Sequence, residues 1–251
     1  MIRALFVCSG SKGNATLIDS GKTLIQIDMG TTLKRLKLGL AEMNKTIDDI
    51  EGVVFTHDHS DHIKGASMMA KRTPLYATEG TLDEYVDSLI FPGQEFEIGD
   101  IKIMPFKASH DAINPVNFVI QVGDERMAYI TDTGIITEEG LSLIKDCDYY
   151  LMESNHDIMM EKKSHRPAYL IARVLGDEGH LSNVDSAHYA CDVIGPHTKA
   201  IYLAHLSDDC NTHEVALDTY KRVFMEREID IHNYDIRCTS QAKSVKGGDW
   251  E

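Results

Sequence analysis

A cluster of histidine and aspartate directly after a short apolar segment constrains this chain more than any other feature. The segment Val53–Thr56 is apolar and β-branched, and it runs into His57–His62, whose sequence is HDHSDH. An extended backbone points side chains two residues apart to the same side, so His57 and His59 are expected to face one way. Imidazole and carboxylate groups suit Zn, Mn or Fe. A solvated histidine-rich loop is the alternative, but the end of a buried strand favours a metal site.

Short β-branched segments alternate with helical patterns along the chain, which predicts an α/β protein with layered sheets covered by helices. The expected strands are Ile2–Val7, Leu24–Asp28, Val53–Thr56, Leu75–Ala77, Ile101–Phe106, Phe118–Val122, Met127–Thr131, Tyr149–Met152, Ala200–Ala204 and Ile229–Ile236. The expected helices are Ile63–Lys71, Leu82–Leu89, Glu138–Lys145, Pro167–Leu175, Val184–Val193 and Thr212–Glu228. We expect one domain over residues 1–251, with about 240–251 as a loosely held polar tail.

The charge balance excludes one class of function. There are 25 Lys and Arg against 40 Asp and Glu, which gives a net charge of −15. A protein held on nucleic acid or on an anionic membrane by a broad basic surface would have the opposite sign. The five scattered cysteines form no Cys-x-x-Cys pair, and no apolar stretch is long enough for a signal peptide or a membrane span. We therefore expect a cytoplasmic protein that does not interact with membranes.

The cluster resembles the signature H-x-H-x-D-H of the metallo-β-lactamase superfamily, and later segments match its other ligand positions in order. These are His110 in a loop after a strand, Asp132 after Tyr129–Thr131, and His205 at the end of Ile201–Ala204. Each alone would be an ordinary loop, capping or core residue. The resemblance implies a four-layer αββα sandwich that holds two divalent ions. It implies that one ion binds His57, His59 and His110, that the other binds Asp61, His62 and His205, and that Asp132 lies between them.

Four further segments resemble the WalJ (YycJ) branch of the superfamily, which contains nuclease-like proteins of bacteria. They are Cys8–Thr16, Glu153–Asp157, Gly179–Asn183 and Ala204–Ser207. The resemblance implies a 5′-to-3′ exonuclease that acts on single-stranded DNA through a metal-bridged hydroxide. A small-molecule (cyclic) phosphodiesterase needs the same metals and is the leading alternative. A lactonase, a thioesterase and a non-hydrolytic iron- or oxygen-sensing module also remain open, as does the choice among Zn, Mn and Fe.

Two residues outside the ligand set are expected to assist the reaction. Glu153 and His180 occupy the relative places of a Glu and a His in the tRNA 3′-processing ribonucleases of the superfamily. This implies that Glu153 favours the charged form of His180, which can then protonate the leaving oxygen. The alternative for His180 is a turn or cap. Asp61 and Asp132 complete the expected catalytic set, in which Asp132 orients the nucleophile.

Six more residues are expected to contact substrate. They are Ser9, Ser11, Asn14, His156, Ser182 and Asn183. Ser182 and Asn183 begin an expected helix, whose N-terminus attracts anions. The first three also fit an ordinary Gly-Ser turn between strands, and His156 also fits a residue that orients a ligand through a hydrogen bond.

Overall fold

Residues 1–82 and 84–250 are described by a computed structural model, in which the chain packs as two units. The first unit contains Met1–Lys107, Ala112–Arg126 and the segment that begins at Ser240. The second unit contains Ala108–Asp111 and Met127–Thr239. The segment His57–His62 therefore belongs to the first unit, whereas the later site residues belong to the second.

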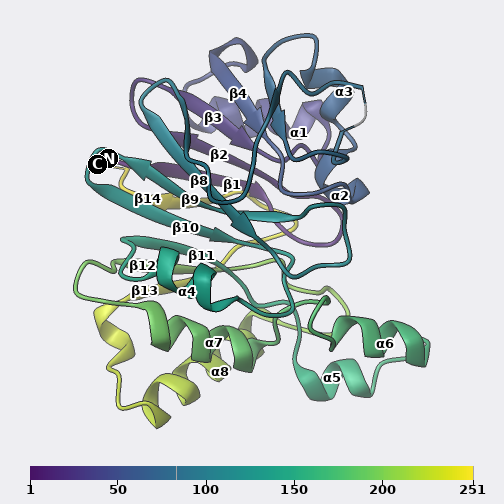
Figure 1. The fold of residues 1–251 in the computed structure, drawn as a ribbon. Coiled ribbons are helices and arrows are strands. Elements are labelled where there is room, and N and C mark those ends of the chain that lie inside the picture. Colours follow the sequence, from purple (N-terminus) through teal and green to yellow (C-terminus); the bar gives the residue numbers. More distant parts are fainter. Residues whose placement is uncertain (83, 251) are drawn as a thin grey trace. The chain divides into compact units, whose positions relative to one another are not determined.

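The first unit is built on a seven-stranded sheet with the order β14-β1-β2-β3-β4-β5-β6 (Figure 1). Neighbours from β14 to β3 are antiparallel, and those from β3 to β6 are parallel. The strands are β1 (Arg3–Cys8), β2 (Ala15–Asp19), β3 (Leu24–Ile27), β4 (Ile50–Val54), β5 (Leu75–Ala77), β6 (Ser88–Leu89) and β14 (Val245–Gly248). A second, antiparallel group in this unit comprises β7 (Phe96–Ile98), β8 (Ile101–Lys107) and β9 (Val116–Val122).

The helices of the first unit are short apart from one. They are α1 (Leu33–Glu42), α2 (Ser60–Ile63), α3 (Ala66–Met69) and the 3₁₀ turn Ile47–Asp49. Helix α1 is capped by the Thr32 side chain and buries Leu36 and Leu40 in the core of this unit. Gly39 allows it to lie close to β1, because a Cβ there would come within 2.8 Å of the Val7 side chain.

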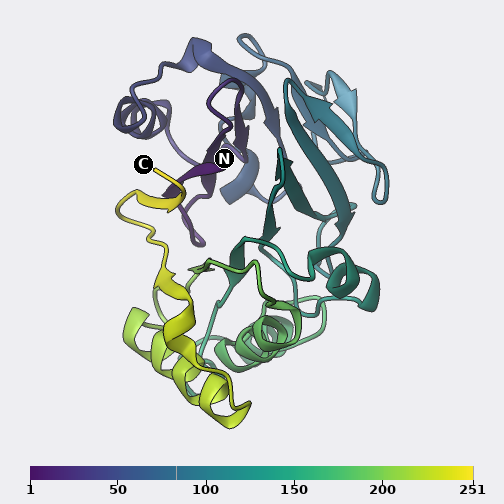
Figure 2. The same ribbon diagram turned by 90° about the vertical axis from the view of Figure 1, so that its left-hand side faces the viewer.

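The second unit contains four parallel strands in the order β10-β11-β12-β13. They are β10 (Glu125–Ile130, of which Met127 onward belongs here), β11 (Tyr149–Glu153), β12 (Ala200–Ala204) and β13 (Asp235–Cys238). Its helices are α4 (Glu138–Ile144), α5 (Ile158–Lys162), α6 (Ala168–Val174), α7 (Asn183–Val193) and α8 (His213–Glu226), with a 3₁₀ turn at Ile231–Asn233. Helices α7 and α8 pack against each other (Figures 1 and 2).

Parallel pairing decides where the polar residues of the second unit lie. Strands β10, β11 and β12 run in one direction and are in register from Met127, Tyr149 and Ala200. Their carboxyl ends therefore meet at one edge, which is where parallel sheets place their sites. Asp132 and His205 follow two of these ends, and Glu153 is the last residue of β11.

Three expectations from the sequence are wrong in the described residues. The strand expected over Ile229–Ile236 is instead a 3₁₀ turn at Ile231–Asn233, and β13 begins only at Asp235. The tail from Ser240 is not loosely held, because β14 pairs with β1 and the Trp250 Nε1 donates hydrogen bonds to Ala4 and Gly247. The helix expected over Leu82–Leu89 is absent from the described part of that segment, where Ser88–Leu89 form β6. Among the helices described, none combines the length and the apolar character needed to cross a membrane.

Candidate active site

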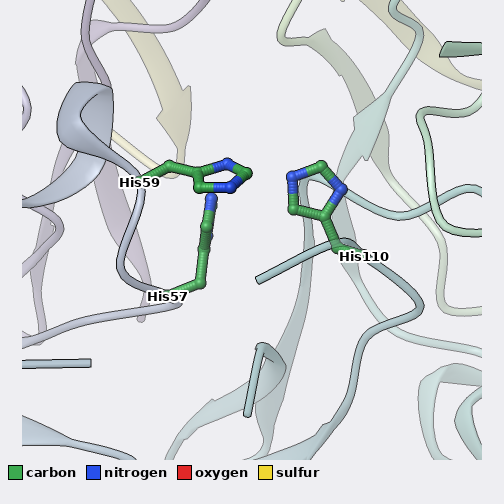
Figure 3. A group of neighbouring side chains, drawn as sticks. All are labelled: His57, His59 and His110. Carbon is green, nitrogen blue, oxygen red and sulfur yellow. The ribbon is translucent and has the colours of Figure 1, made fainter. Parts of the chain in front are cut away.

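The segment HDHSDH brings three imidazole rings together within the first unit. Beyond β4 the chain bends at Asp58, and His59 has an extended backbone directly before α2. The ring centroids of His57 and His59 are 4.7 Å apart, and those of His57 and His62 are 4.1 Å apart. Figure 3 shows the His57 and His59 rings next to each other at the end of this loop. The predicted clustering of the first histidines is therefore present in the structure.

Asp28 is a buried carboxylate behind these ligands that sequence reasoning missed. Its Oδ2 lies 2.8 Å from His62 Nδ1, and its Oδ1 accepts a hydrogen bond from the Thr56 backbone N–H. An ionised carboxylate only accepts, so His62 Nδ1 carries the proton and Nε2, which lies 2.9 Å from the Asn14 side-chain nitrogen, is the acceptor atom of the ring. The only signal for it in the sequence is its position at the end of an apolar strand, two residues before Gly30.

Three of the other four histidines expected to bind metal have a comparable partner at Nδ1. Nδ1 of His57 is 3.0 Å from the Thr56 hydroxyl, which can itself donate to Asp28. Nδ1 of His110 is 3.0 Å from the Gly179 carbonyl, and that of His205 is 3.0 Å from Glu153 Oε1. With Nδ1 as the donor, each ring keeps Nε2 for a metal, and this orientation is typical of metal-binding histidines.

Four residues at one edge of the parallel sheet form the cluster of the second unit. Asp132, Glu153, His180 and His205 each offer an atom within 4.8 Å of the others. Asp132 Oδ1 is 3.4 Å from His205 Nδ1, 3.6 Å from His180 Nδ1 and 3.8 Å from His110 Nε2. Asp132 and His205 adopt left-handed φ angles of 52° and 54°. Such angles are uncommon outside glycine and are often found at functional sites.

Glu153 lies at the centre of this cluster as a fully buried carboxylate with four donors around it. Oε1 accepts from His180 Nδ1 at 2.8 Å and from His205 Nδ1 at 3.0 Å. Oε2 accepts from the backbone N–H groups of Thr133 and Leu181. Burial alone would raise the pKa of Glu153, but the charge and hydrogen bond of His180 and the hydrogen bond of His205 lower it to about 2. The predicted Glu153–His180 contact is thus present, and Glu153 also holds His205.

The six residues expected to contact substrate lie in different surroundings. The Asn14 side-chain nitrogen is 2.9 Å from His62 Nε2 and 3.3 Å from Asp61 Oδ2. In contrast, Ser11 is exposed, and Ser9 is buried with its backbone bonded to Ser240. Asn14 is therefore the member of this turn that contacts the predicted ligands.

The other three lie around the start of α7. The Ser182 hydroxyl caps α7, because it accepts a hydrogen bond from the Asp185 backbone N–H. Asn183 is buried, and its amide bonds to Ser154 and Asn211, so that it holds the helix to the end of β11. His156 is buried as well, and burial lowers its pKa below the usual value.

The donor sets of both units fit divalent cations. Imidazole nitrogens and carboxylate oxygens serve Zn, Mn and Fe, and each unit gathers both kinds of donor in a buried cluster. Buried carboxylates gathered at this density are costly unless positive charge lies beside them, which a cation would supply. Asp61, His62 and the neighbouring histidines supply the donors of the first unit, and His110, Asp132 and His205 supply those of the second.

Comparisons with known proteins agree with this chemistry. A family model described as "Beta-lactamase superfamily domain" matches residues 17–206. The chain is 33% identical to Exodeoxyribonuclease YycJ of Bacillus anthracis, with 95% of this chain and 97% of the relative covered. It is 34% identical to Exodeoxyribonuclease WalJ of Streptococcus pneumoniae, with 84% and 83% covered.

A solved structure supports the fold independently. The metallo-β-lactamase fold protein YhfI of Bacillus subtilis matches with a TM-score of 0.74 and 16% identity, covering 98% of this chain and all of that one. The predicted α/β class, the αββα sandwich of this superfamily, is confirmed. Together, the matches favour a metal-dependent nuclease over the cyclic phosphodiesterase and the lactonase. The chain belongs to the β-lactamase superfamily and, within it, to the family of the exodeoxyribonucleases YycJ and WalJ.

Proposed function

We propose that this protein is an exodeoxyribonuclease that hydrolyses single-stranded DNA from the 5′ end with two divalent ions of Zn, Mn or Fe. The observation that carries the proposal is the Glu153–His180 pair beside Asp132 and His205. A nucleotide alkoxide is a poor leaving group and needs a proton donor, whereas an activated thiolate or phenolate does not. The names of the two bacterial relatives support DNA as the substrate.

The ligand set that we propose is the one expected from the sequence. In this proposal His57, His59 and His110 would hold one ion, Asp61, His62 and His205 would hold the other, and Asp132 would contribute to both. When bound, the ions activate water and stabilise charge on the phosphoryl oxygens. The buried carboxylates Asp28 and Glu153 orient His62 and His205 for this task. The cytoplasmic location expected from the sequence remains part of the proposal.

The protein side chains handle the proton of the leaving group. In the proposed step the water oxygen bonds to phosphorus, the phosphorus–O3′ bond breaks, and O3′ receives a proton from His180. The attacking water loses its proton to solvent, from which His180 is protonated again. Nδ1 of His180 is held by Glu153, which leaves Nε2 as the atom that can donate. The ionised Glu153 stabilises the positive charge on His180 before the transfer.

The test is a metal-reconstitution panel on the purified protein. Labelled single-stranded DNA, bis(p-nitrophenyl) phosphate, a lactone and a cyclic nucleotide are each assayed with Mn and with Zn. We expect mononucleotides from DNA, with a 5′ label released first and all activity lost with a chelator or in Asp61→Ala. Circular dichroism checks that the variant is folded. Faster hydrolysis of the lactone or the cyclic nucleotide than of DNA overturns the proposal.

A further inference from the structure

A pocket of about 330 Å³ lies within the second unit next to His180. It is lined by parts of α5, α7 and the loops before α4 and α7, and none of the seven predicted metal ligands lines it. Its volume is at the lower end of the range for ligand pockets, about 300–1,000 Å³. The pocket is thus separate from the predicted metal ligands but reaches the residue proposed to protonate the leaving oxygen.

His156 is the most unusual group in the wall of this pocket. Its side chain is 1% exposed, and neither ring nitrogen has a hydrogen-bond partner in the described part of the chain. Its backbone is fixed, since it bridges to Ser182 and its carbonyl accepts from the Asn183 N–H. A buried polar group without a partner is costly, so a ligand that supplies the partner is the physical reason to keep it.

The charge of the pocket argues against an anion as its occupant. Lys162 is one cation at the wall, but the carboxylates of Asp177 and Asp185 also line it. His180, which is charged before the proposed proton transfer, is a second cation at the wall, so the pocket carries no net positive charge that would favour a phosphate. His156 is buried and its pKa is lowered by burial, so its ring is neutral and offers one donor and one acceptor.

One part of the wall is apolar and suits the flat face of a nucleobase. Ile135, Leu175 and Tyr189 line the pocket together with the polar residues. Aromatic and aliphatic side chains stack on the face of a nucleobase without reading its sequence. A neutral imidazole can hydrogen-bond to a base edge or a sugar hydroxyl in the same pocket.

We infer that this pocket holds the deoxynucleoside on the leaving side of the scissile bond, with His156 as its polar contact. The inference rests on the proposed function, because the leaving side is defined by the proton that His180 donates. A pocket of this size holds one nucleoside. When the terminal nucleoside occupies it, the bond presented for cleavage is the one after the first nucleotide. This accounts for exonucleolytic rather than internal cleavage by a feature of the chain's own surface.

The experiment compares His156→Leu with the wild-type protein on single-stranded DNA and on bis(p-nitrophenyl) phosphate, which has no nucleoside. Loss of a hydrogen bond to a buried group predicts that kcat/KM for DNA falls about tenfold more than that for the small substrate. Free 2′-deoxyadenosine inhibits the wild-type protein, and its Ki rises by about the same factor in the variant. His156→Gln keeps a neutral donor and acceptor. Relative to His156→Leu, it regains part of the kcat/KM for DNA and part of the affinity for 2′-deoxyadenosine.

Two controls separate binding from folding. His165→Leu makes the same change at an exposed histidine of the second unit and leaves both rates and the Ki unchanged. His156→Leu keeps or raises Tm, because it removes an unpartnered buried polar group. Equal loss on both substrates, or unchanged 2′-deoxyadenosine inhibition in His156→Leu, overturns the inference.

Failure of the proposed function gives a different result. In that case the wild-type protein releases no mononucleotides from DNA, while calorimetric titration with 2′-deoxyadenosine still tests the pocket. Binding that is lost in His156→Leu supports the nucleoside pocket, and no binding to the wild-type protein overturns it.

Discussion

At the scale of single residues, Asp28 decides which nitrogen of His62 is available to a metal. In Asp28→Asn the amide keeps the shape but can donate to His62 Nδ1, which moves the ring proton to Nε2 and blocks the ligand atom. We expect metal affinity to fall by about 10- to 100-fold. Competition with a chelating dye measures it, and Asp48→Asn at an exposed carboxylate is the matched control. Unchanged affinity in Asp28→Asn would show that the pair has no role in metal binding.

Substitution of His180 distinguishes an effect on catalysis from an effect on metal binding. Its Nδ1 is bonded to Glu153, so His180→Ala removes a proton donor and leaves the proposed ligands in place. We expect kcat for DNA to fall by about 10²- to 10⁴-fold, with metal content unchanged. Elemental analysis of the purified variant beside single-turnover kinetics provides the measurement. Stoichiometric loss of metal would instead identify His180 as a ligand.

These residues differ in how far the sequence could reveal them. His57, His59 and His62 lie within six positions, and their spacing alone places the rings close together. Asp28 is 34 positions from its partner His62, and the contact depends on the parallel pairing of β3 with β4. Local patterns carry no information on such a contact. For the same reason the burial of Asn183 against Ser154 could not be predicted.

At the scale of elements, the strands that carry the site were predictable and some of their neighbours were not. Strands β10, β11 and β12 are short apolar segments that end at polar residues, a pattern that the sequence makes visible. Helix α1 was missed because its exposed face is basic and it contains Gly39, a poor helix former. The polar composition of β14 concealed a strand that is stabilised by its pairing with β1.

Trp250 tests whether β14 contributes to folding. The ring is partly buried against the core of the first unit, Nε1 donates to Ala4, and Lys246 lies 4.3 Å from the ring centroid. We expect Trp250→Ala to lower the free energy of unfolding by about 2 kcal/mol, less than for a fully buried aromatic residue. Urea denaturation measures it, and Trp250→Phe, which loses the N–H but keeps a ring, should fall between the two. An unchanged urea midpoint in Trp250→Ala would show that the segment from Ser240 does not contribute to stability, as expected of a loosely held tail.

At the scale of the whole molecule, the net charge of −15 limits how DNA can be held. The logarithm of the binding constant for single-stranded DNA falls linearly with the logarithm of the salt concentration. Each phosphate that a Lys or Arg neutralises adds about 0.7 to the magnitude of this slope. With 15 more carboxylates than cations, we expect no long basic track on this protein and propose that binding depends on a few contacts near the strand end. The proposed nucleoside pocket is of this kind, because the contacts that we assign to the nucleoside come from the neutral His156 ring and the apolar parts of the wall.

The salt dependence of KM for single-stranded DNA measures this directly. Between 50 and 200 mM salt we expect a slope of magnitude below about 2, because no more than about three phosphates are neutralised by side chains. Hydrolysis of bis(p-nitrophenyl) phosphate over the same range corrects for effects of salt on the chemical step. A corrected slope of about 5 or more would require a broad cationic surface, and DNA would then be held along its backbone rather than at its end. A shallow slope together with release of single nucleotides is the result expected when the terminal nucleoside, and not the backbone charge, sets the position of the cut.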